Sequence, residues 1–261
     1  MNGQFVEGPK HSLGTATIQL LAFPFAGGNS RCYQELQRAL PTSVKLSTYE
    51  LPGHGLRMRE SLLRDMAAVV DDALRRVDSL LDEPYALYGH SFGAAVAREL
   101  AQRVFELGRP MPRQIFVSGR RAPASVVVDT PLHQLSSASF HARLAKYGGT
   151  PPAVLQNAEL MAMFERILRA DLQALESAPQ GRSRPLDVPI HVMVGLEDDV
   201  TEEQVQAWQL ETLQPLSVSR FSGGHFFIRE HAAEIAARIA EDLGMDQVTP
   251  SHRARNTALG F

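Results

Sequence analysis

Short apolar stretches alternate with amphipathic stretches along most of the chain. Runs rich in β-branched and aromatic residues are typical of strands, and they occur at 16–23, 44–51, 85–89, 114–120, 190–195 and 217–223. Between them, apolar residues recur three and four positions apart, from Leu62 to Leu80 and from Val96 to Leu107, which predicts amphipathic helices. Strands that alternate with helices are typical of a parallel sheet covered by helices. The pattern therefore predicts an α/β fold with a mostly parallel central sheet.

One interval, residues 122–189, is much longer than an ordinary connection between strands. It carries its own helical stripe, from Leu160 to Leu175, and the pairs Gly148-Gly149 and Pro151-Pro152 predict a turn within it. We expect a helical insertion that forms a lid over the sheet, although it could also be one more packing layer. Residues 1–243 are expected to form a single domain, and 244–261 lack periodicity and are expected to form a flexible tail.

Composition narrows the class of protein. The chain is 44% hydrophobic and 21% charged, as ordinary globular proteins are, and its net charge of −3 offers no basic surface for nucleic acid. No run of apolar residues is long enough to cross a membrane, and the first residues do not resemble a secretion signal. The single cysteine, Cys32, fits a reducing compartment. We therefore expect a cytoplasmic protein, a monomer, with no nucleic-acid or membrane partner.

The clearest chemical motif is Gly89-His90-Ser91-Phe92-Gly93, which is a G-x-S-x-G sequence. It follows a predicted strand and precedes a predicted helix, the context in which this motif presents a nucleophilic serine on a sharp turn. Glycines two residues on either side leave room for that turn. Ser91 is therefore the predicted nucleophile.

A serine hydroxyl needs a neighbouring base to take its proton. In enzymes with this motif, the histidine follows the last strand. His225 lies there, after the Gly223-Gly224 turn and before a predicted helix. His231 is expected inside that helix, and His90 is expected to point away from the nucleophile. His225 is therefore the predicted base.

An acid should follow the preceding strand and orient the histidine. Asp198 and Asp199 both lie there. Asp198 is preferred because of its G-x-x-D spacing from Gly195, but spacing cannot decide between neighbours. No metal or cofactor is expected.

The tetrahedral intermediate needs N–H donors for its oxyanion. One predicted donor is the amide of Phe92, after the nucleophile. The second is expected from the loop Phe23-Pro24-Phe25-Ala26-Gly27-Gly28, with Ala26 preferred over Phe25. The glycines in that loop could also mark a tight turn only.

Taken together, these segments resemble the type II thioesterases that accompany modular polyketide synthases and nonribosomal peptide synthetases, which are α/β-hydrolases. The resemblance covers about residues 18–243, and its motifs are FPFAGG, LPGHG, GHSFGA, a G-x-x-D that precedes Trp208, and GGHFFI. One position departs from the family pattern, because His54 stands where the family usually has an arginine.

The resemblance implies hydrolysis of acyl groups from the phosphopantetheine arm of an acyl or peptidyl carrier protein, to edit or regenerate mis-acylated assembly lines. It implies a triad of Ser91, Asp198 and His225, with Ala26 and Phe92 at the oxyanion hole. Phe25 is a candidate substrate contact at a narrow entrance. The alternatives are a chain-releasing thioesterase or a small-ester carboxylesterase on the same fold, and a non-catalytic scaffold.

Carrier proteins of this type are generally acidic, so a basic rim is expected around the entrance. The candidates are Arg31, Arg57, Arg59, Arg120, Arg121 and Arg143. Most of them could also be ordinary surface charges.

Overall fold

A seven-stranded sheet forms the centre of the described part of the chain. The structure is a computed structural model, and it describes residues 6–7, 17–125, 130–149, 154, 157–181 and 184–245. The sheet has the strand order β1-β3-β2-β4-β5-β6-β7. Its strands are β1 (Val6–Glu7), β2 (Ile18–Phe23), β3 (Val44–Thr48), β4 (Tyr85–His90), β5 (Ile115–Ser118), β6 (Ile190–Gly195) and β7 (Ser217–Phe221).

Strands β2 to β7 all run parallel, and only the short edge strand β1 is antiparallel to its neighbour. This confirms the predicted α/β class with a mostly parallel sheet. Every residue of β4, β5 and β6 is buried, since helices cover both faces of these strands.

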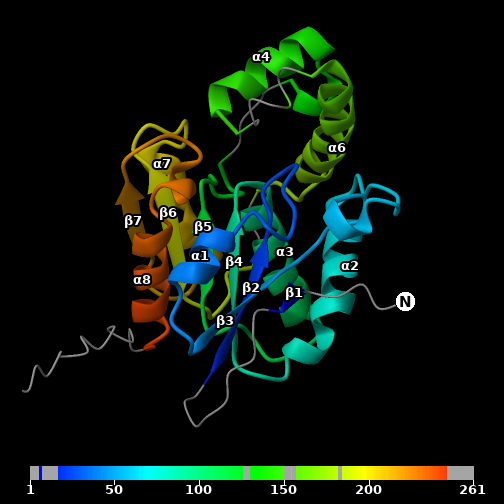
Figure 1. Cartoon of the computed structure of the whole chain (residues 1–261). Helices are drawn as coiled ribbons and strands as arrows, with labels where there is room; N and C mark the ends of the chain where they lie inside the picture. Colours follow the sequence, from blue (N-terminus) through cyan, green and yellow to red (C-terminus); the bar gives the residue numbers. More distant parts are fainter. Residues whose placement is uncertain are drawn as a thin grey trace, which may run out of the picture.

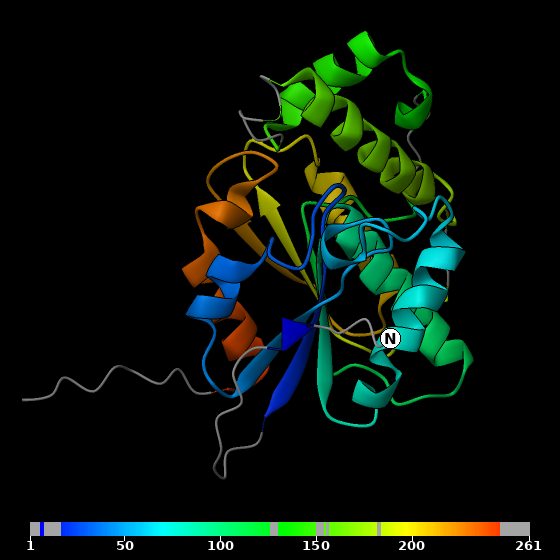
Figure 2. The ribbon, with the colours of Figure 1, turned by 45° about the vertical axis from the view of Figure 1, so that its right-hand side comes forward.

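Two helical layers enclose the sheet (Figures 1 and 2). Helices α1 (Gln34–Ala39) and α8 (Ala232–Asp242) cover one face, and α2 (Met66–Val77) and α3 (Phe92–Glu106) cover the other. The remaining short elements are η1 (Gly55–Arg57), η2 (Asp78–Leu80), α7 (Glu202–Gln206), η4 (Ala207–Glu211) and η5 (Phe227–Arg229). Each layer packs its own apolar cluster against the sheet.

The predicted helices are present with shifted ends. Helix α2 begins at Met66, because Asp65 accepts a hydrogen bond from the Ala68 amide as its N-cap, and Leu62 therefore lies in the preceding loop. His231 was expected inside the last helix. It instead lies at the N-cap of α8, where its Nδ1 is 2.9 Å from Glu234 Oε1.

The long interval between β5 and β6 contains helices of its own, namely η3 (Leu132–Gln134), α4 (Ser137–Tyr147) and α6 (Ala158–Glu176). Both views place α4 and α6 above the carboxyl edge of the sheet (Figures 1 and 2). Leu168 and Leu175 of the predicted stripe are buried, whereas Leu160 at the other end of α6 is 41% exposed. The inner half of α6 therefore packs on the sheet layer, and its outer end does not.

Polar contacts attach α4 to α6. Glu165 of α6 accepts a hydrogen bond from Ser137 Oγ of α4 at 2.8 Å, and it also contacts His141 of α4. Helix α4 ends at Gly148, whose φ of 68° is left-handed, as the predicted Gly-Gly turn requires. The predicted Pro151-Pro152 turn and most of the predicted tail, 246–261, lie outside the described residues.

No described helix combines the length and the apolar character needed to cross a bilayer.

The expectation that Arg57 belongs to an exposed basic rim is wrong, because Arg57 is buried. Arg57 is 7% exposed, and its NH1 is 2.6 Å from Asp72 Oδ2 and 2.9 Å from the Glu50 carbonyl oxygen. Its NH2 is 2.6 Å from Glu60 Oε2. The helical stripe that predicted α2 gave no sign that its polar residue Asp72 would be buried and would need a cation.

We predict that Arg57→Gln destabilises the fold by about 3 kcal/mol, because the Asp72 carboxylate loses its closest, buried cationic partner and retains the exposed Arg75 at 3.4 Å. Arg59 is exposed, so Arg59→Gln should change stability by less than about 0.5 kcal/mol. Urea denaturation of both variants measures the difference. Equal stabilities would show that the buried contact contributes little.

Candidate active site

Ser91 lies at the sharp turn between β4 and α3, in a strained backbone conformation. Its φ of 54° and ψ of −110° make it the one non-glycine residue with positive φ among those described. The Ser91 amide donates a hydrogen bond of 2.8 Å to the Ser118 carbonyl at the end of β5, which helps to hold this conformation. The turn places Ser91 at the carboxyl edge of the sheet, directly before the N-terminus of a 15-residue helix.

The two glycines of the motif are required because backbone comes very close to them. A Cβ on Gly89 would lie 2.0 Å from the Gly93 carbonyl oxygen, and a Cβ on Gly93 would lie 1.9 Å from the Phe23 carbonyl oxygen. Strand β2, the elbow and α3 are therefore packed backbone against backbone at Ser91.

His225 and Asp198 are brought together at the ends of β7 and β6. His225 Nδ1 lies 3.0 Å from Asp198 Oδ2 and 3.1 Å from Oδ1, and the Asp198 side chain is only 2% exposed. The loops can meet because Gly195 has no side chain; a Cβ there would lie 2.5 Å from the carbonyl oxygens of Gly223 and Gly224. Asp199, the alternative acid, is exposed and does not contact His225.

His90 is buried beside this pair and faces away from solvent. Its Nδ1 lies 2.9 Å from Ser118 Oγ, and its ring centroid is 4.9 Å from that of His225. Burial, together with the charges of His225 and Arg229, lowers the pKa of His90 well below its usual value. His90 is therefore neutral and supports the ring of His225, and this contact places His225 beside the elbow.

The loop after β2 forms a tight turn next to Ser91. The Gly28 amide donates to the Phe25 carbonyl at 2.8 Å, and Gly27 has a φ of 73°, as the third residue of a type II turn requires. The Gly27 amide donates to Asp171 Oδ2 at 2.7 Å. The amides of Ala26 and Phe92 donate to no other described group, so both predicted oxyanion donors are available.

A match to a known family shows which kind of protein carries this site. The thioesterase domain family matches residues 18–243. The chain belongs to the thioesterase family.

Similar proteins agree with this assignment. The gramicidin S biosynthesis protein GrsT of Aneurinibacillus migulanus is 31% identical, with 87% of this chain and 90% of that protein covered. ClbQ from the colibactin NRPS/PKS pathway is 29% identical with a TM-score of 0.81, covering 87% of this chain and 97% of that one. The type II thioesterase BorB from the borrelidin biosynthetic cluster is 31% identical with a TM-score of 0.79, covering 89% and 95%. The chain is thus a hydrolase of thioesters with the α/β-hydrolase fold, similar to type II thioesterases of NRPS/PKS pathways.

Aromatic residues of this thioesterase surround His225, and some of them were not predicted from the sequence. The ring of Tyr147, the last residue of α4, lies 5.2 Å from that of His225. Phe226 lies 5.2 Å from His225 and 5.1 Å from Phe25, the predicted substrate contact. The sequence offered one sign of this role for Tyr147, namely its position as an aromatic residue directly before the Gly148-Gly149 turn.

The loop that carries His225 also holds the end of α4. The Gly149 carbonyl accepts a hydrogen bond of 3.1 Å from Arg229, and a Cβ on Gly149 would lie 2.3 Å from the Phe226 ring. Arg229 in turn lies over that ring at 4.5 Å. The end of the inserted segment therefore packs directly against the loop that carries His225.

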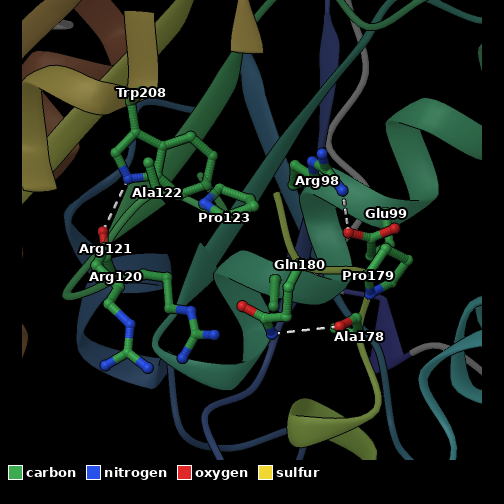
Figure 3. Close-up of a pocket in the computed structure, with 11 residues that line it drawn as sticks. Arg98, Glu99, Arg120, Arg121, Ala122, Pro123, Ala178, Pro179, Gln180 and Trp208 are labelled. Carbon is green, nitrogen blue, oxygen red and sulfur yellow. Dashed lines mark hydrogen bonds and ion pairs between the residues drawn. The ribbon is translucent and has the colours of Figure 1, made fainter. Parts of the chain in front are cut away.

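A small pocket lies between α3, the end of β5 and the segment after α6 (Figure 3). The Arg120 carbonyl accepts a hydrogen bond of 2.8 Å from the fully buried Trp208. The side chains of Arg120 and Arg121 both extend from this strand end, and neither has an ion pair with a described residue. Burial and the charge of Arg121 lower the pKa of Arg120 to about 10.

Among the described residues, no cluster of His, Cys, Asp or Glu side chains could hold a metal ion.

We predict that Gly93→Ala destabilises the thioesterase by about 3 kcal/mol, because its methyl group would collide with backbone that cannot move independently. Gly108→Ala is the control, since a Cβ there meets nothing within 4 Å and the cost is only the strain of its φ of 64°, about 1 kcal/mol. Urea denaturation of both variants tests this. If Gly93→Ala were no less stable than Gly108→Ala, the close packing at the elbow would be refuted.

Proposed function

We propose that the enzyme hydrolyses acyl groups from the phosphopantetheine arm of acyl or peptidyl carrier proteins, and that Ser91, His225 and Asp198 are its catalytic triad. The observation that carries the triad is the His225–Asp198 contact beside the strained Ser91 elbow. The substrate class is supported by the similarity to biosynthetic thioesterases. We expect it to act in the cytoplasm, as a monomer.

The reaction begins when His225 Nε2 takes the proton of the Ser91 hydroxyl and Ser91 Oγ attacks the thioester carbonyl. Asp198 accepts the Nδ1–H of His225, which leaves Nε2 free to act as the base and stabilises the imidazolium that forms. The resulting oxyanion is bound by the amides of Ala26 and Phe92. The N-terminal end of α3 adds a favourable electrostatic field.

Collapse of this intermediate breaks the carbon–sulfur bond, and the leaving thiolate takes the proton from His225. An acyl ester on Ser91 remains. His225 then removes a proton from water, the resulting hydroxide attacks the ester, and the acid is released as Ser91 regains its proton. Both halves of the reaction use the same base and the same oxyanion donors.

The aromatic side chains over the base fit an acyl chain. Phe25, Phe226 and Tyr147 form an apolar wall around His225, and the lid segment supplies Tyr147. A wall of this kind excludes water other than the attacking molecule, which strengthens the electrostatic interactions with the intermediate. We therefore infer that the insertion works as a lid over an acyl chamber.

For the acid, we predict that Asp198→Asn lowers kcat on the order of 10⁴-fold, because the amide no longer selects the correct tautomer of His225. Asp199→Asn is the matched control and should lower kcat by less than about twofold, since the Asp199 side chain is exposed. Steady-state hydrolysis of an acyl thioester measures both. A larger loss in the Asp199 variant would move the assignment by one residue.

A second prediction concerns the carrier. Arg31 and Arg59 are exposed, and Arg31→Glu with Arg59→Glu should raise KM for acyl-carrier protein about 10-fold through lost charge complementarity. Hydrolysis of a small acyl thioester should be nearly unchanged.

The substrate class is tested by comparing the rates at which the enzyme hydrolyses acyl-carrier protein and a p-nitrophenyl ester. The Ser91→Ala variant serves as the inactive control. A preference for the free ester by orders of magnitude would favour the carboxylesterase alternative. If the double arginine variant lost activity equally on acyl-carrier protein and on the small acyl thioester, carrier docking would lie elsewhere on the protein.

A further inference from the structure

A single buried carboxylate joins the lid to two loops of the active site. Asp171 lies in the inner part of α6 and is 2% exposed. Its Oδ2 accepts the Gly27 amide at 2.7 Å, and the same oxygen lies 3.0 Å from Nε2 of His54, which is 3% exposed. Helix α6, the turn after β2 and the loop after β3 therefore meet at one atom.

The contacts of His54 show which protons it carries. Its Nδ1 lies 3.1 Å from the Pro52 carbonyl oxygen, which can only accept a hydrogen bond, and its Nε2 faces the Asp171 carboxylate. Both ring nitrogens are satisfied together only when both carry a proton. His54 is therefore held as an imidazolium.

The charges around His54 agree with this state. Burial lowers the pKa of His54, but the hydrogen bond and charge of Asp171, the Pro52 carbonyl and the charge of Glu50 together raise it above its usual value. Glu50 itself accepts from the amide and hydroxyl of Ser30. The nearby Arg57 pairs with the carboxylates of Asp72 and Glu60, and it contacts Glu50 only at the backbone carbonyl.

The peptide that Asp171 holds is the one that defines the turn. Type I and type II turns differ by a flip of the central peptide, which here joins Ala26 to Gly27. The hydrogen bond to Asp171 fixes that peptide, and the positive φ of Gly27 fits the type II form. Side chains of α6 close the other side, because a Cβ on Gly27 would lie 2.9 Å from both Phe164 and Leu168.

We propose that Asp171 and His54 are positioning residues for catalysis: Asp171 fixes the turn that presents the Ala26 amide to the oxyanion, and the proton on His54 Nε2 holds Asp171 in place. This rests on the proposed role of Ala26. It follows that the inner part of α6 stays attached to the oxyanion loop and that any opening of the lid occurs at α4.

The pH dependence has a defined direction. Below its raised pKa, His54 donates to both Pro52 and Asp171. Above that pKa only one proton remains, so one of the two acceptors loses its donor, and the positive charge that attracts the Asp171 carboxylate is lost. The contribution of the pair to catalysis is therefore present at lower pH and is lost as pH rises through the pKa of His54.

Two amide substitutions separate the two sides of the His54 ring. In His54→Gln the amide nitrogen reaches the position of Nε2 and keeps the donor to Asp171, whereas in His54→Asn it reaches only the position of Nδ1. Asp171→Asn removes the charge that the pair needs. The control is Asp242→Asn, which disrupts a His–Asp contact between α8 and His191 on β6, remote from the oxyanion loop.

The experiment measures kcat, KM and their pH profiles for a small acyl thioester, together with the affinity for a trifluoromethyl ketone that forms a tetrahedral oxyanion on the nucleophile. We expect His54→Asn and Asp171→Asn to lower kcat by about 10- to 100-fold with little change in KM. We expect the same variants to bind the trifluoromethyl ketone more weakly by a similar factor. His54→Gln should retain kcat within about fivefold and lack the alkaline decline of the wild type. Asp242→Asn should retain kcat.

Two results would overturn the positioning role. The first is that His54→Asn and Asp171→Asn have a kcat and an affinity for the ketone no lower than those of Asp242→Asn. The pair would then be a structural contact only. The other is an alkaline decline in His54→Gln equal to that of the wild type. Failure of the proposed function would look different, because the wild type itself would then not hydrolyse the acyl thioester.

Discussion

The strained backbone of Ser91 is the constraint on which the rest of the site depends. A φ of 54° is unfavourable for a serine, so surrounding structure must hold it. The Ser118 carbonyl accepts a hydrogen bond from the Ser91 amide, Gly89 lets the elbow pack against the start of α3, and Gly93 lets α3 pack against the end of β2. The sheet order makes these contacts possible, because β2 and β5 both flank β4. The central sheet thus fixes Ser91, while the loops around it carry the residues to which we assign the roles of base, acid and oxyanion donors.

Two carboxylates with different tasks organise those loops. Asp198 binds His225 at the ends of β6 and β7, and we assign it to the proton chemistry of the triad. Asp171 binds the Gly27 turn and His54 on the opposite side of the elbow, and we assign it to the geometry of the oxyanion hole. Both are nearly inaccessible to solvent, where an ionised group needs partners. The insertion therefore reaches the site at two places, since α6 holds the turn at Gly27 and α4 brings Tyr147 close to His225.

The sequence was informative where the chemistry depends on local spacing. Strand periodicity predicted the sheet, and the motif around Ser91 predicted the sharp turn after β4. The G-x-x-D spacing and the turn before His225 pointed to Asp198 and His225, which lie in contact. Contacts between distant segments were not predictable in this way. Asp171 belongs to an otherwise ordinary amphipathic helix, and neither it nor His54 shows from spacing that they would lie 3.0 Å apart. Arg57 was misassigned for the same reason, since a buried cation is recognised only from its partners.

The central claim is that acyl groups pass through an ester on Ser91. Mixing the enzyme with acyl-carrier protein, quenching in acid within milliseconds and digesting the protein tests it directly by mass spectrometry. We expect the acyl mass to appear on the peptide that contains Ser91, to disappear at the rate of turnover and to be absent in Ser91→Ala. Turnover with no acyl-enzyme at any time, or with the acyl group on another residue, would contradict it.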